Sequence, residues 1–293
     1  MIPKRLRLSD VVEEYLDLKP IDPKPTRLAV EAFFSVAGER EIADYTREDA
    51  KAFLFLLEQR GNSTGTIRRR INSISAILNY GFAELDIDKR NPFSRLVIKA
   101  EGLDRKKRGT FTTQQLQEGY QEALGGKSSV RLLMPILGET GCRLAEIVGL
   151  RVEDVDLEAK VLRIRPNAMR RLKTAGSERD LPIVGCAEEA LRKALSGSED
   201  GWVFPRYIHD DGCRATHASN ALNKWLKGRF GGLTAHSLRH TMRDRLRAVE
   251  APLELIDQVG GWSSVNNIGS RYGQGYKIDQ LAAWLDSIKV CGD

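Results

Sequence analysis

The chain has 293 residues, of which 41% are hydrophobic and 29% are charged. This length favours two domains with enough sequence to bury a core, and the composition is typical of an ordinary soluble globular protein. No apolar run approaches the roughly 20 residues that a membrane span needs, and the basic N-terminus has no apolar core behind it, so we expect neither a membrane anchor nor a secretory signal. The net charge of +6 permits nucleic-acid binding without requiring it.

The spacing of the cysteines and histidines matches neither a disulfide framework nor a metal-binding motif. The four cysteines lie far apart and form no C-x-x-C pair; they are Cys142, Cys186, Cys213 and Cys291. This spacing favours free thiols in a reducing compartment. His236 and His240 are four positions apart, but no glutamate follows His236 as in the H-E-x-x-H motif of metalloproteases. We therefore expect free thiols and no metal site.

The first hundred residues are predicted to be all-helical. Amphipathic patterns and capping signals place helices over residues 8–20, 26–36, 46–60 and 63–85, with the segment at 21–25 as a turn. In the last of these, apolar residues recur every three or four positions and form one buried stripe: Ile67, Ile71, Ile74, Leu78 and Phe82. Arg68, Arg69 and Arg70 flank the stripe, so at least two face away from the core. They could neutralise DNA phosphates or simply form a solvated face.

The chain changes character after Asn91. An Asn-Pro pair ends the helical pattern, and a polar stretch without periodicity follows, with the basic cluster Arg105, Lys106, Lys107 and Arg108. We interpret residues 101–110 as a linker between a helical domain at 1–100 and a second domain at 111–293. A basic linker suits a protein that closes around a polyanion, although such linkers also occur for solubility alone.

The second domain is predicted to be mainly α-helical with a small antiparallel β-sheet. Thr112 and Gln115 form a capping-box pattern that begins a helix ending near Gly125, and an apolar helix over 128–141 follows. Alternating apolar residues predict two strands within 151–166, and a third strand follows a loop at 173–176. Helices are expected at about 186–195, 215–228, 236–249, 252–259 and 277–288.

A candidate site for phosphodiester cleavage lies between residues 234 and 273. His236 and Arg239 are three positions apart on a predicted helix, so both could point at one phosphate. Tyr272 follows within the glycine-bordered stretch GSRYGQG, which could deliver it to the same place. Arg143 and Glu146 repeat the three-residue spacing upstream. Taken singly, each of these pairs is also compatible with a solvated helix face.

Considered together, these stretches resemble the tyrosine recombinase family, also called phage integrases. The matching stretches are TGCRLAEIVGLRVEDVD, LKTAGSERDLPI, AHSLRHT and GGWSSVNNIGSRYG. The resemblance covers residues 110–280, and the first domain looks like the family's helical core-binding domain. It implies a core-binding domain joined to a recombinase-type catalytic domain. It also implies a site-specific DNA recombinase or integrase that works through a 3′-phosphotyrosine intermediate.

The resemblance also implies a role for each matching residue. Arg143 and Arg239 would hold the non-bridging oxygens of the scissile phosphate, for which the guanidinium fork is suited. Tyr272 would attack phosphorus, and Lys173 would protonate the departing 5′-oxygen. His236 would assist proton transfer or donate a hydrogen bond to the phosphate.

Three further positions complete the expected site. Trp262 stands where most relatives carry His; its indole N–H donates a hydrogen bond but accepts no proton, so it can only position. Glu146 matches a supporting acidic residue, with a weak surface ion pair to Arg143 as the alternative. The interval from Trp262 to Tyr272 is one residue longer than in typical members, so Tyr276 stands as a second candidate nucleophile.

The implied partner is double-stranded DNA with specific recombination sites, and the implied chemistry uses no metal or other cofactor. The family acts as a tetramer on DNA, so we expect a free monomer that assembles there, with accessory DNA-bending or directionality proteins. We expect a cytoplasmic, nucleoid-associated protein without the additional arm-binding domain of larger integrases. The helix at 277–288 could pack on a neighbouring protomer or on its own domain. The alternative functions are type IB topoisomerase-like cleavage and a catalytically silent DNA-binding regulator.

Overall fold

The computed structural model describes residues 6–105, 109–172, 175–262 and 275–291. The chain divides into two compact units, Met1–Lys107 and Arg108–Asp293, and each is described by itself. The division falls within the basic stretch at 101–110. In the described part of the chain, no helix is both long enough and apolar enough to cross a membrane.

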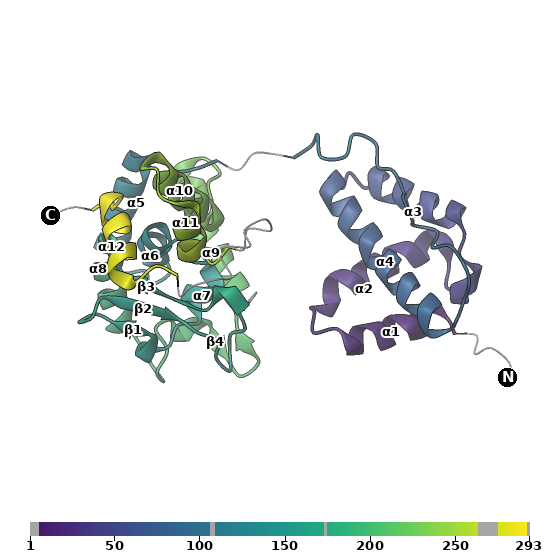
Figure 1. The fold of residues 1–293 in the computed structure, drawn as a ribbon, viewed down its shortest axis with the longest axis horizontal. Coiled ribbons are helices and arrows are strands. Elements are labelled where there is room, and N and C mark those ends of the chain that lie inside the picture. Colours follow the sequence, from purple (N-terminus) through teal and green to yellow (C-terminus); the bar gives the residue numbers. More distant parts are fainter. Residues whose placement is uncertain (1–5, 106–108, 173–174, 263–274, 292–293) are drawn as a thin grey trace. The chain divides into compact units, whose positions relative to one another are not determined.

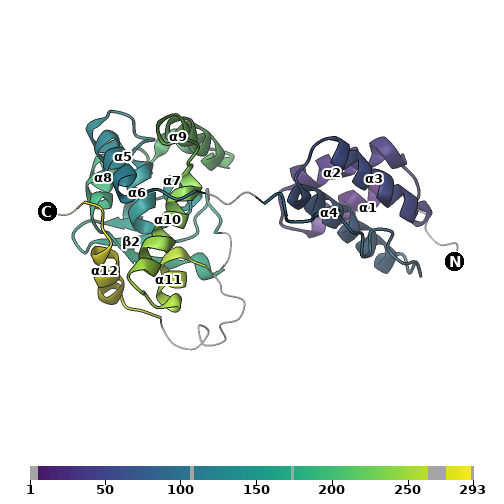
Figure 2. The ribbon, with the colours of Figure 1, turned by 90° about the horizontal axis from the view of Figure 1, so that it is seen from above.

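Unit 1 (Met1–Lys107) is helical, as the sequence predicts. Its elements are α1 (Leu8–Leu18), α2 (Pro23–Ala37), the 3₁₀ helix η1 (Ile42–Asp44), α3 (Arg47–Gln59) and α4 (Thr64–Glu84). α4 packs against the three other α-helices (Figure 2). The apolar residues of the predicted stripe from Ile67 to Phe82 are all buried. The prediction of one buried face on this helix is therefore confirmed.

One helix start in unit 1 was predicted too late. The segment at 21–25 was expected to be a turn, whereas α2 already begins at Pro23. Asp22 caps this helix by accepting a hydrogen bond from the backbone N–H of Lys24 at 3.0 Å. Proline is favoured at the first position of a helix because its missing N–H would have no partner there, so both prolines of this segment fit inside α2.

Unit 2 (Arg108–Asp293) is mainly helical. Its α-helices are α5 (Thr113–Gly125), α6 (Leu133–Thr140), α7 (Leu144–Val148), α8 (Cys186–Leu195), α9 (Ala215–Phe230), α10 (Ala235–Ala248), α11 (Leu253–Gly260) and α12 (Ile278–Ser287). Three 3₁₀ helices lie between them: η2 (Val152–Asp154), η3 (Ala175–Ser177) and η4 (Pro205–Tyr207). All eight residues of α6 are buried, because α5, α8 and α10 pack around it (Figure 1).

A small antiparallel sheet supports one side of unit 2, as predicted. β1 (Val155–Asp156), β2 (Val161–Ile164) and β3 (Arg179–Pro182) lie in this order, and Leu162 is paired with Leu181 across the β2–β3 ladder. Both leucines are fully buried in the core. A second hairpin, β4 (Ile208–His209) with β5 (Gly212–Cys213), was not predicted. Strands of two residues are too short to show an alternating pattern.

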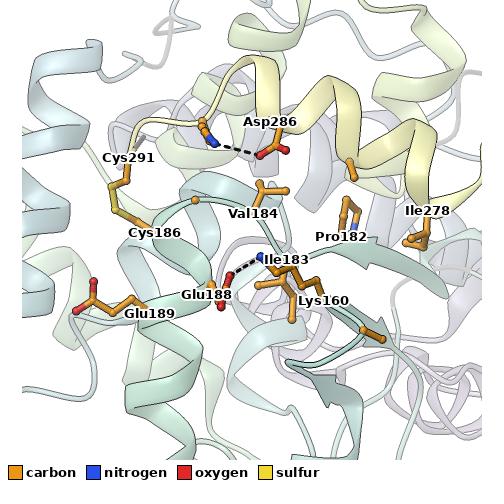
Figure 3. Close-up of a pocket in the computed structure, with 14 residues that line it drawn as sticks. Lys160, Pro182, Ile183, Val184, Cys186, Glu188, Glu189, Ile278, Asp286 and Cys291 are labelled. Carbon is orange, nitrogen blue, oxygen red and sulfur yellow. Dashed lines mark ion pairs between the residues drawn. A yellow bond between two sulfur atoms is a disulfide. The ribbon is translucent and has the colours of Figure 1, made fainter. Parts of the chain in front are cut away.

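The C-terminal helix α12 packs on its own unit, where it contacts β3 (Figure 1). Its Leu281 and Leu285 are buried in the core of unit 2. This packing brings the end of the chain to the start of α8, where Cys291 and Cys186 form a disulfide with a Cα–Cα distance of 5.5 Å. Figure 3 shows the bond beside the pocket between α12 and β3.

The expectation of free thiols is therefore wrong for one pair of cysteines, while Cys142 and Cys213 are free. The bonded cysteines are 105 positions apart in sequence. They meet because α12 folds back onto β3, and a spacing pattern along the chain cannot reveal such an approach.

Candidate active site

Arg143 and Glu146 stand at the start of α7. α6 is followed by Gly141, where a φ of 64° changes the direction of the chain. Arg143 is the last residue before α7 begins. The Glu146 carboxylate accepts hydrogen bonds from the backbone N–H of Arg143 at 2.9 Å and from its Nη1 at 2.6 Å. A side chain at the third helical position that caps the residue before the helix is the acidic half of a capping box.

Arg143 also reaches two segments that are distant in sequence. Its Nη1 donates to the hydroxyl of Ser177 at 3.1 Å, and its Nη2 donates to the carbonyl of Gly261 at 3.0 Å. The Arg143 side chain keeps 25% of its surface exposed, whereas the Glu146 side chain keeps 4%. The pair is therefore not the surface contact that the sequence left open, although the Arg143 side chain keeps part of its surface exposed.

A second arginine binds Glu146 from the opposite side. Nη2 of Arg179, the first residue of β3, lies 2.9 Å from Oε2 of Glu146, and both side chains are 4% exposed. Burial alone would raise the pKa of the Glu146 carboxyl, but the charge and hydrogen bond of Arg179 and the bonds from Arg143 outweigh it. The pKa of Glu146 is lowered as a result.

Arg239 lies on α10 and is almost completely buried. Its Nη1 donates to the carbonyl of Gly141 and its Nη2 to the carbonyl of Gly260, each at 2.5 Å. Burial, together with the positive charge of Arg143, lowers the pKa of Arg239 to about 10. The two guanidiniums are therefore close enough to repel each other.

The turn after α11 explains the sequence Gly260-Gly261-Trp262. Gly261 adopts a φ of 58°, and the backbone N–H of Trp262 then donates to the carbonyl of Asp257 at 2.9 Å. A Cβ at Gly260 would collide with the Trp262 indole. The ring lies under the Arg239 guanidinium, 4.3 Å from its Cζ to the ring centroid. Trp262 therefore contacts the arginine rather than merely filling the core.

His236 lies in the first turn of α10, one turn before Arg239, as the sequence predicts. Its side chain is exposed, and its ring stands edge-on to that of His240 with 4.8 Å between centroids. The exposed imidazole lies on the same helix as the buried guanidinium of Arg239. Among the described residues, no group of three His, Cys, Asp or Glu side chains is placed to hold a metal ion.

The two remaining catalytic candidates, Lys173 and Tyr272, lie outside the described residues. Tyr276, the second candidate nucleophile, is described. Its backbone N–H donates to the side-chain amide of Gln258 at 2.8 Å, and its carbonyl accepts from the same amide at 2.9 Å. The Tyr276 ring is half-buried against the core of unit 2. This residue anchors the chain just before α12.

The basic residues expected to contact DNA differ in their exposure and in the partners that they already bind. Arg68 forms a two-pronged ion pair with Glu101 at 2.7 and 2.6 Å and also donates to the carbonyl of Leu96. Arg69 is exposed on α4, Arg70 is half-buried, and Arg105 is exposed. The cluster members Lys106, Lys107 and Arg108 lie outside the described residues.

Comparison with known proteins places this site in a family. Residues 110–277 match the model of the Phage integrase family. The chain is 29% identical over 257 residues to the tyrosine recombinase XerC of Herpetosiphon aurantiacus, covering 82% of this chain and 80% of that protein. It is 26% identical over 235 residues to the tyrosine recombinase XerD of Oceanobacillus iheyensis, covering 75% of each.

Solved structures share the fold at low sequence identity. The Tn1549 transposon integrase in complex with a circular intermediate DNA matches with a TM-score of 0.68 and 18% identity, covering 96% of this chain and 99% of that one. A lambda integrase tetramer bound to a Holliday junction matches with a TM-score of 0.67 and 15% identity, covering 89% and 79%.

The helical fold, the paired arginines and the family match define a DNA strand-transfer enzyme of the tyrosine type. The chain belongs to the Phage integrase family, whose model spans more than half of it. Its enzyme class is that of the tyrosine site-specific DNA recombinases.

Proposed function

We propose that this protein cleaves and rejoins double-stranded DNA at specific sites through a 3′-phosphotyrosine on Tyr272. The observation that carries the proposal is the convergence of two guanidiniums on one turn. Arg143 donates to the carbonyl of Gly261 and Arg239 to that of its neighbour Gly260. A phosphate bound beside this turn would meet both cations.

The arginines would hold the non-bridging oxygens of the scissile phosphate. Guanidiniums match the geometry of phosphate and stay charged at neutral pH. The transition state gathers negative charge on those oxygens, and cations fixed beforehand stabilise it without reorganising. The frame around Arg143 and Arg239 supplies this fixation, since carbonyls, Glu146 and Trp262 contact their guanidiniums.

The proposed chemistry balances without an outside reactant. The phenolic oxygen of Tyr272 attacks phosphorus as its proton passes to His236 or to water, the bond between phosphorus and the 5′-oxygen breaks, and Lys173 donates a proton to that oxygen. His236, exposed beside Arg239, would take part in proton transfer or donate a hydrogen bond to the phosphate. Rejoining reverses each step with a 5′-hydroxyl as nucleophile, so the energy of the phosphodiester is conserved.

The assembly is part of the same proposal. Unit 1 would serve as the core-binding domain, with a linker at 101–110 and the catalytic domain at 111–293. Its phosphate contacts would come from basic side chains: Arg69, Arg70, Arg105, Lys106, Lys107 and Arg108. Four protomers would exchange strands between two sites, with accessory proteins setting direction, at the nucleoid in the cytoplasm. The related lambda integrase fold, seen as a tetramer on a Holliday junction, supports this arrangement.

Arg68 is the weakest of the expected DNA contacts. Its guanidinium is already paired with Glu101 and with the carbonyl of Leu96. A phosphate would have to displace the carboxylate to reach it. We therefore propose that Arg68 fixes the segment that follows α4 and that the exposed Arg69 and Arg105 neutralise phosphates in its place.

Covalent capture tests the function. Wild-type protein, Tyr272→Phe and the matched control Tyr276→Phe are incubated with DNA from the encoding locus, denatured in SDS, and the protein-linked DNA is sequenced. An adduct at one short site that disappears only in Tyr272→Phe supports the proposal. An adduct that disappears only in Tyr276→Phe moves the nucleophile. Adducts at scattered sites indicate topoisomerase-like cleavage, and binding without any adduct indicates a silent regulator.

A further inference from the structure

Arg179 is a buried arginine within the stretch LKTAGSERDLPI, and the proposed chemistry gives it no role. It is the first residue of β3 and lies six positions after Lys173 in the sequence. We infer that Arg179 is a positioning residue that holds Arg143 in its phosphate-binding orientation. This inference rests on the proposed function, because it concerns how the same phosphate site is built.

The Arg179 guanidinium joins three separate segments to β3. Its Nη2 donates to Glu146 at 2.9 Å and lies 3.3 Å from the sulfur of Cys142. Its Nη1 donates to the carbonyl of Ser177 at 2.6 Å, and its Nε donates to the carbonyl of Val259 at 2.9 Å. The residue therefore ties the start of α7, the end of η3 and the end of α11 to one rigid group.

Two of these contacts act on the partners of Arg143. Glu146 binds Arg143 through both carboxylate oxygens, and Arg179 shares one of them, so it fixes the rotation of that carboxylate. Gly261 accepts from Arg143, and a Cβ on Gly261 would lie only 2.8 Å from Nη1 of Arg179. Arg179 thus binds Glu146 and Ser177 and packs beside Gly261, and these three residues hold the Arg143 guanidinium.

The burial of Arg179 argues for a role beyond stability. Removing an ion pair from water has a large desolvation cost, and apolar side chains of similar volume often replace buried pairs without loss of stability. A planar group with five donors, however, can bond several acceptors in fixed directions at once. No apolar side chain forms such a set of directed hydrogen bonds. The advantage of arginine at position 179 is therefore that it fixes the positions of its acceptors.

The test compares two substrates that differ in charge. Duplexes carrying the site found by covalent capture are made with either the natural phosphodiester or an uncharged methylphosphonate at the scissile position, and the rate of covalent adduct formation is measured. Arg179→Met should slow the reaction of the phosphodiester by about 100-fold, the scale of a misplaced catalytic group. The rate with the methylphosphonate should fall by less than about 10-fold, because this substrate develops less negative charge for Arg143 to stabilise.

The matched control is Arg245→Met. Arg245 is another arginine of unit 2, with a side chain only 14% exposed; it is paired with the fully buried Glu139 and contacts none of Arg143, Glu146 or Gly261. Its loss should lower the melting temperature without changing the ratio of the two rates. Arg179→Lys keeps the charge with fewer directed donors and should give an intermediate ratio. This variant decides the question if Arg179→Met does not fold.

The outcomes separate this inference from the proposed function. If Arg179→Met and Arg179→Lys slow both substrates equally, Arg179 stabilises the fold and positions nothing. If the ratio changes as expected only in the Arg179 variants, the positioning role is supported. If the wild-type protein forms no adduct on the phosphodiester, the proposed function fails, whatever Arg179 does.

Discussion

Reduction of the Cys186–Cys291 disulfide should destabilise unit 2 by an amount set by the loop that it closes. The two cysteines are 105 positions apart, and the loop between them includes His236, Arg239 and Trp262. Cross-linking a loop of this length removes chain entropy from the unfolded state worth about 4.7 kcal/mol in the chain-entropy model. For a domain of this size, that corresponds to a melting temperature lower by roughly 10–20 °C after reduction.

Thermal unfolding followed by circular dichroism, with and without dithiothreitol, measures this difference. Cys291→Ser should lower the melting temperature of the oxidised protein to that of the reduced one. The control Cys213→Ser removes a free, partly buried thiol and should change it little. Thiol titration of the denatured, unreduced protein should find two free thiols, from Cys142 and Cys213. Four would disprove the disulfide, and an intact disulfide with unchanged melting on reduction would refute the entropy argument.

Three other changes test the site and its ligand. Gly260→Ala would drive a Cβ into the Trp262 indole and should cost about 1–3 kcal/mol in urea unfolding; unchanged stability would contradict the tight turn. Because the folded pKa of Glu146 is lowered, its stabilisation should be full above the unfolded value of about 4.3 and lost as pH falls through the folded pKa. The stability gap between wild type and Glu146→Gln should therefore shrink in acid, and a constant gap would refute this. DNA affinity should fall about 10³-fold from low to high salt for roughly six phosphate contacts, and a flat response would exclude phosphate-dominated binding.

The sequence predicted those features that depend on local periodicity. The stripe from Ile67 to Phe82 on α4 and the placement of His236 and Arg239 one turn apart on α10 both follow from the helical repeat, and both are present. The capping box at Thr112 was also correct. Each of these features is formed by residues that lie close together in the sequence. One segment of the chain is therefore enough to predict it.

The features that the sequence did not predict depend on distant segments meeting. Arg179 looks like one charge among several in the stretch SERD, and only the fold places it between Glu146 and Val259. The spacing of Arg143 and Glu146 is also compatible with a solvated helix face, whereas Arg143 in fact precedes α7 and is held there by Glu146. The disulfide depends on α12 returning to β3. Hydrophobic pattern carries no information about such approaches.

The lowered pKa of Arg239 relates the surroundings of this side chain to the charge of the ligand that the site would bind. The two hydrogen bonds of its guanidinium go to the carbonyls of Gly141 and Gly260, and neither acceptor carries a full negative charge. A pKa of about 10 means that the free protein holds this cation at a cost of about 3 kcal/mol relative to water. A phosphodiester beside Arg143 and Arg239 carries one negative charge and would offset part of that penalty. The repulsion between the two arginines in the free protein therefore favours DNA binding, and it favours most the transition state, in which the phosphoryl oxygens are most negative.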